Sequence, residues 1–135
     1  MTLVSTLLSG VPLVGRGLAL AALIGLAGCE PSGPGSLTAI VQAPGPAGAL
    51  VIELTGIGIT GFEGVGAART FDAPAAPGST ARRVVVVSST GTAIRFRIKV
   101  EDVSGTLPTA AVVSGVDLSN QPIPSLSEYG VRISR

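Results

Sequence analysis

Histidine and tryptophan are absent from this 135-residue chain, which contains one cysteine, one tyrosine and three phenylalanines. Without histidine, the chain lacks the side chain that most often acts as general base, metal ligand or proton shuttle near neutral pH. A single cysteine excludes an internal disulfide bond. Because aromatic rings are scarce, Val, Ile, Leu and Ala must fill any core, and glycan binding on stacked aromatic platforms is disfavoured.

No catalytic arrangement stands out among the residues that are present. The sequence contains no Gly-x-Ser-x-Gly motif, and its serines have neither a histidine nor a spare cysteine nearby to activate or replace them. A Ser–Lys pair would have to use Lys99, which strand alternation directs toward solvent. We therefore expect a protein that is not an enzyme, with no cofactor and no metal site.

An uncharged apolar run, Gly17 to Gly28, follows Arg16 and ends at the cysteine. Its last residues and the cysteine, Leu26-Ala27-Gly28-Cys29, resemble the lipobox of bacterial lipoprotein precursors. The resemblance implies a signal peptide over residues 1–28, cleavage between Gly28 and Cys29, and diacylglycerol on the Cys29 sulfur. An uncleaved anchor is the alternative, but the run is shorter than the roughly 20 residues that a spanning helix needs.

The same resemblance predicts where the protein resides. Acyl chains on Cys29 would hold it on a bacterial membrane. In some bacteria an aspartate directly after the lipidated cysteine marks retention in the inner membrane. This chain has Glu30 there instead, which favours the outer membrane or cell surface. Residues 29–36 are rich in Pro, Gly and Ser and predict a short flexible tether. Residues 37–135 would then form a single domain close to the bilayer.

Charge is balanced in the part that would remain after cleavage. Arg16 is the only charged residue before Cys29, so eight basic and eight acidic residues follow it. A neutral domain carries no electrostatic footprint for nucleic acid. The expected partners are the membrane, through the acyl chains, and an unidentified protein or envelope polymer.

Period-two alternation of apolar residues predicts short strands separated by Gly- and Pro-containing turns. The expected strands are Leu37–Val41, Ala49–Thr55, Arg69–Phe71, Ala81–Ser88, Ile94–Val100, Ala110–Val116 and a final one around Tyr129–Ile133. We expect the first two to pair as a hairpin, and likewise Ala81–Ser88 with Ile94–Val100. The run Val84 to Val87 predicts a central strand covered on both faces.

About seven or eight such strands favour an all-β fold, a single small antiparallel β-sandwich that is immunoglobulin-like in the broad sense. A small β-barrel is the alternative. The strand pattern is loosely similar to that of cohesin-like and other immunoglobulin-like bacterial surface modules.

The segment Gly56 to Ala67 contains five glycines, and its first six residues fit the G-x-G-x-x-G pattern of dinucleotide sites. That site requires a helix next, whereas two more glycines follow. We expect a glycine-bulged strand or a loop instead.

Three cations, Arg95, Arg97 and Lys99, alternate along one predicted strand and would share its outer face, about 7 Å apart. They could contact an anionic surface. The simpler interpretation is a solvated face, paired across strands with carboxylates such as Glu53 or Glu101.

The loop Asp117–Ser127 offers oxygen ligands, as does Glu101-Asp102. Calcium prefers six to eight oxygens, and these two separate segments are weak evidence for such a site. Turn formation by the Asp117 side chain is the simpler interpretation.

The sequence predicts a lipid-anchored, non-catalytic binding or structural module. The alternative function is a lipoprotein that binds a small ligand or Ca²⁺ through the Gly56–Gly66 or Asp117–Ser127 loops.

Overall fold

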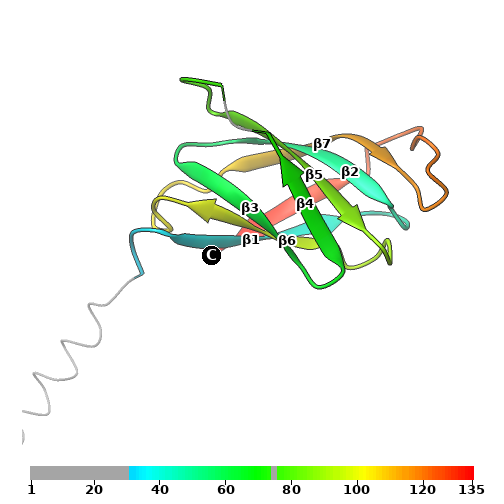
Figure 1. The fold of residues 1–135 in the computed structure, drawn as a ribbon, viewed down its shortest axis with the longest axis horizontal. Helices are drawn as coiled ribbons and strands as arrows, with labels where there is room; N and C mark the ends of the chain where they lie inside the picture. The colour runs from blue at the N-terminus through cyan, green and yellow to red at the C-terminus, as the bar shows by residue number, and fades with distance from the viewer. Residues whose placement is uncertain (1–30, 74–75) are drawn as a thin grey trace, which may run out of the picture. The chain divides into compact units, whose positions relative to one another are not determined.

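The computed structural model describes residues 31–73 and 76–135, which form eight β-strands (Figure 1). They are β1 (Gly35–Gln42), β2 (Ala49–Thr55), β3 (Ile59–Val65), β4 (Ala68–Asp72), β5 (Ala81–Ser88), β6 (Arg95–Val100), β7 (Thr109–Val116) and β8 (Gly130–Ser134). The predicted signal peptide, its cleavage site at Gly28 and the Cys29 lipidation site lie outside the described residues.

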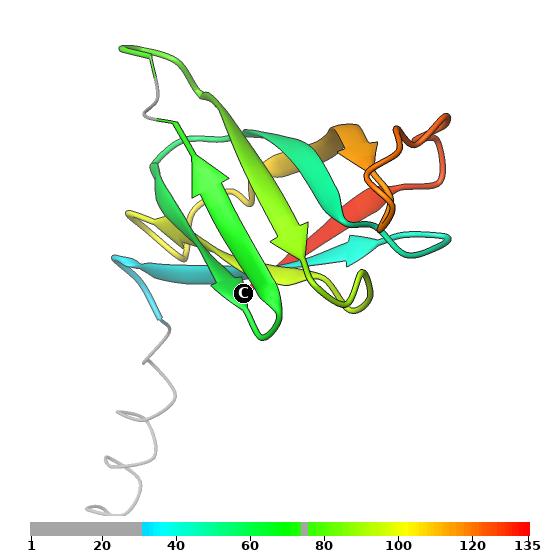
Figure 2. The ribbon, with the colours of Figure 1, turned by 45° about the vertical axis from the view of Figure 1, so that its right-hand side comes forward.

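Two four-stranded sheets face each other across the core (Figures 1 and 2). Sheet A has the order β3-β6-β1-β8 and sheet B the order β4-β5-β2-β7. All six strand pairings are antiparallel. The predicted β-sandwich is therefore confirmed, and the barrel alternative is not the observed fold.

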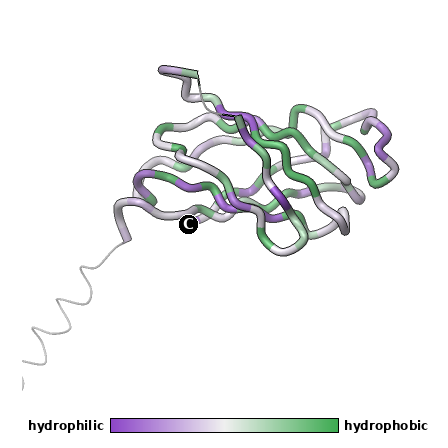
Figure 3. Tube along the Cα trace, viewed as in Figure 1, coloured by the Kyte–Doolittle hydropathy of each residue, from purple (hydrophilic) through white to green (hydrophobic). Residues whose placement is uncertain are grey.

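Apolar alternation builds the core, as the hydropathy colouring along the strands illustrates (Figure 3). In β6 the buried Phe96, Ile98 and Val100 alternate with exposed cations. Leu50, Ile52 and Leu54 of β2 face them from sheet B and are fully buried. Burying each such side chain contributes about 1.5–3 kcal/mol. All of these core residues lie between Ser32 and Arg135, one compact unit.

Both predicted hairpins are wrong. β1 pairs with β6 and β8, whereas β2 pairs with β5 and β7, so β1 and β2 lie in different sheets. β5 and β6 are likewise separated. The connections cross between the layers, which lets the apolar faces of successive strands meet across the core. Alternation in the sequence predicts which face of a strand points inward. That face is the same whether two strands pair within one sheet or lie opposite each other in two sheets.

The central position predicted for β5 is confirmed, since β5 lies between β4 and β2. The prediction that it is covered on both faces is wrong. Val84 and Val86 are fully buried, but Val87 on the outer face is 37% exposed. The reason is that sheet B has only one layer of protein packed against it within the described chain.

Glycines mark irregular pairing, as the sequence predicted for the segment from Gly56. β3 shifts register against β6 between Ile59 and Gly61, so this segment is a bulged strand rather than a dinucleotide site. At the β3–β4 corner, a Cβ on Gly64 would collide with the carbonyl oxygen of Ala68. That close approach of two backbones requires glycine.

Candidate functional site

Hydrogen bonds hold the N-terminal segment against the domain from Gly33, two residues before β1 begins. The Gly33 amide donates to Oδ1 of Asp102 at 3.0 Å, and the Val103 amide donates to the Gly33 carbonyl at 2.9 Å. Gly35 pairs with Val100 at the start of β1. The part of the predicted tether from Gly33 onward therefore belongs to the folded domain.

Asp102 is the acceptor at the centre of this attachment. Its Oδ1 takes hydrogen bonds from the Ser104 hydroxyl at 2.7 Å, from the Ser104 amide at 3.0 Å and from Gly33. These bonds, that of the Ser104 side chain foremost, lower the pKa of the Asp102 carboxyl. The end of the sandwich at which the tether enters therefore keeps this negative charge to a lower pH than an ordinary aspartate would.

The predicted cation row is present on the outer face of sheet A. Arg95, Arg97 and Lys99 are all exposed and alternate with buried core residues of β6. The sheet adds Arg132 of β8, because Arg95 and Arg132 are both in register with Ile40 of the intervening β1. Sequence reasoning missed Arg132. Alternation in β8 places it opposite the inward side chains, but only the sheet order shows which cations it joins.

The outer face of sheet A has too few carboxylates to balance the charge of its four cations. Glu63 of β3 is the residue in register with Arg97, and it is the sole carboxylate on the outer face of the four sheet A strands. Within residues 31–73 and 76–135, no salt bridge involves any of the four cations. The expected pairing with Glu53 is wrong, because Glu53 lies in sheet B. Glu101 follows the last residue of β6 and lies in the loop where the tether enters.

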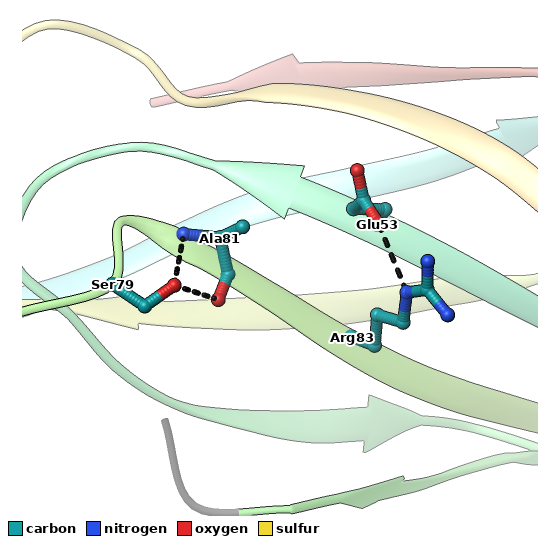
Figure 4. A network of polar contacts seen from close by, with 4 residues as sticks. All are labelled: Glu53, Ser79, Ala81 and Arg83. Carbon is teal, nitrogen blue, oxygen red and sulfur yellow. Dashed lines mark hydrogen bonds and ion pairs between the residues drawn. The ribbon is translucent and has the colours of Figure 1, made fainter. Parts of the chain in front are cut away.

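The outer face of sheet B is less basic than that of sheet A and is partly apolar. Three of its large apolar side chains, Phe71, Val87 and Val113, are exposed. Glu53 accepts a hydrogen bond from Nε of Arg83 at 2.9 Å across β2 and β5 (Figure 4). At the start of β5, the Ser79 hydroxyl donates to the Ala81 carbonyl and accepts from the Ala81 amide (Figure 4). The two faces of the sandwich thus differ, one basic and the other partly apolar.

A pocket of about 550 Å³ opens beside the attachment of the tether. Its walls come from the β2–β3 loop, the loop after β6 and the adjoining core, and they include Ile57, Leu107, Glu101 and Asp102. Ile57 is 89% exposed. The pocket thus combines apolar side chains with two carboxylates and contains the Gly56–Gly58 part of the predicted ligand-binding loop.

The other candidate loop is organised by its own turn. Oδ1 of Asp117 accepts from the amides of Ser119 and Gln121, at 2.9 and 3.0 Å. Asn120 has a positive φ of 61°. These contacts are typical of the turn-forming role that the sequence suggested for this aspartate. In the described part of the chain, no three His, Cys, Asp or Glu residues gather as metal ligands would.

Comparison with known proteins adds no relative. The chain matches no protein-family model, and no curated protein or solved structure is significantly similar to it. Within residues 31–73 and 76–135 there is also no helix with the length and apolarity to cross a membrane.

Proposed function

We propose that this chain is a lipid-anchored protein of the bacterial envelope, in which a β-sandwich acts without catalysis as a binding or structural module. The observation that carries the proposal is the ordered stretch Leu26-Ala27-Gly28-Cys29 at the end of an apolar run. Lipidation also accounts for the single cysteine in a protein that would be exported.

The attachment of Gly33 supports this assignment. Three residues separate Cys29 from Gly33, so the Cα atoms of the lipidated cysteine and of the first hydrogen-bonded residue would lie at most about 14 Å apart. A domain held this closely acts at the membrane surface rather than at a distance from it. Two or more acyl chains give stable anchoring, because each buried CH₂ contributes about 0.8 kcal/mol.

The test is the intact mass of protein extracted from bacterial membranes. We expect loss of residues 1–28 and the addition of diacylglycerol on Cys29. The Cys29→Ser variant should carry no diacylglycerol and should retain the uncleaved signal peptide, which adds the mass of residues 1–28. An unmodified Cys29 in membrane-extracted protein would rule out the anchor.

The pocket beside the tether favours a second candidate function, the binding of a small ligand. Its apolar walls around Ile57 and Leu107, next to the Glu101 and Asp102 carboxylates, suit an apolar molecule that carries a positive charge. Dansylcadaverine, an apolar fluorescent amine, is a direct probe. Saturable binding that Leu107→Arg abolishes would support this function. Equal binding by the variant would count against it.

A further inference from the structure

We propose that the outer face of sheet A rests on an anionic lipid bilayer, so that the anchored domain lies on its side. The proposal rests on the lipid anchor proposed above and specifies which surface meets the membrane. Four cations and one carboxylate give this face a net charge of three positive: Arg95, Arg97, Lys99 and Arg132 against Glu63.

The cations form a broad flat patch rather than a pocket. Alternate residues of β6 lie about 7 Å apart, so Arg95 and Lys99 span about 14 Å. Arg95 and Arg132 flank Ile40, so two strand spacings of about 4.8 Å separate them. None of the four lines the pocket beside the tether. A flat array of separated cations matches a plane of lipid phosphates better than it matches one small anion.

Charge on the other surfaces distinguishes this orientation from an upright one. An upright domain would bring the tether end to the headgroups, where Glu101 and Asp102 outnumber Arg135. Asp102 remains ionised there, because its hydrogen bonds lower its pKa. The resulting excess of negative charge opposes contact with anionic lipid.

The outer face of sheet B is a weaker candidate for membrane contact than the outer face of sheet A. Its outer face carries Arg69 and Arg83 against Glu53, and Arg83 is already paired with that carboxylate. The net charge of that face is one positive, compared with three positive on sheet A. The most positive surface of the described domain is therefore the outer face of sheet A.

The tether makes the side-on orientation reachable. Gly33 would lie within about 14 Å of the Cys29 Cα atom, and two residues later the chain enters β1, a strand of sheet A. The surface potential of an anionic membrane acts over a Debye length of about 8 Å at physiological ionic strength. The anchor therefore holds the start of sheet A close to the range in which its cations are attracted.

Vesicle sedimentation tests the proposal with residues 32–135, which contain both sheets and the complete core but no Cys29. We expect binding to phosphatidylcholine vesicles with 30% phosphatidylglycerol, release in 0.5 M salt, and no binding to phosphatidylcholine alone. Each Lys or Arg near such a surface raises the binding constant about fivefold. Arg95→Gln with Arg97→Gln should therefore weaken binding about 30-fold.

Arg69→Gln with Arg83→Gln is the matched control, since it removes the same charge from the opposite face and should weaken binding less than threefold. Glu63→Gln removes the carboxylate of the outer face of sheet A and should strengthen binding about fivefold. Equal losses in the two double variants would overturn the proposal, as would tighter binding to soluble dextran sulfate than to vesicles. Because residues 32–135 lack Cys29, failure here is distinct from failure of lipidation, which the mass of the full chain reports.

Discussion

The guanidinium of Arg82 lies over the ring of Phe62, with Cζ 5.6 Å from the ring centroid, and so joins β5 of sheet B to β3 of sheet A. The same guanidinium donates to the Ile59 carbonyl and to the Asp72 carboxylate, each at 2.9 Å. Its side chain is 12% exposed. Phe62 in turn contacts Phe96 in the core, with centroids 6.3 Å apart. A charged side chain therefore closes the space between the layers.

Replacing Arg82 should destabilise the sandwich. Arg82→Met keeps much of the apolar contact but removes a cation–π interaction and two charge-assisted hydrogen bonds, and we expect a loss of about 1–3 kcal/mol. Urea unfolding measures it. Arg83→Met is the control, because Arg83 is 69% exposed and its exposed ion pair contributes about 0–1 kcal/mol. Equal losses in the two variants would contradict the role given to Arg82.

Phe96 should be the most sensitive aromatic position. It is fully buried between the sheets, so Phe96→Ala leaves a cavity and should cost about 3–5 kcal/mol. Phe71→Ala offers a matched comparison, because Phe71 is 59% exposed and its loss should change stability by less than about 1 kcal/mol. Chemical denaturation of both variants checks this difference, and a small effect at Phe96 would mean that the core is packed differently.

Gly64 should tolerate no side chain. An alanine Cβ there would meet the backbone of Ala68 and Arg69, which cannot move aside without breaking the corner. We expect Gly64→Ala to cost about 1–3 kcal/mol. Gly45→Ala, with open space around its added methyl, should be neutral or stabilising by about 0.4–1 kcal/mol. Thermal melting distinguishes the two, and similar melting temperatures would argue against the close approach at the corner.

Stability should depend on the charge of Asp102 in acid. Hydrogen bonds from Ser104 and Gly33 lower the pKa of this carboxyl in the folded state. The stabilisation is therefore fully present above the unfolded-state value of about 3.9. It is lost as the pH falls through the lower folded-state value. The melting temperatures of wild type and Asp102→Asn should differ at pH 6 and converge toward pH 2, whereas a constant difference would exclude the charge as the cause.

The strands and their inward faces were predictable from the sequence. In β6, strict alternation places Phe96 inward and Arg97 outward, because successive side chains in a strand point to opposite faces. The bulged strand after Gly56 was predictable for a similarly local reason, since repeated glycine interrupts regular pairing. The lipobox resemblance at Cys29 also depends only on a short ordered stretch of residues.

Strand partners were decided by the tertiary structure. A polar–apolar alternation identifies the face that is buried, but β1 buries the same face whether it pairs with β2 or lies opposite it. Packing resolved that choice by placing the two strands in different sheets. The same step brought Arg132 beside Arg95 and separated Glu53 from the cations of β6. The composition of the basic face thus depends on sheet order, a long-range property that local periodicity does not encode.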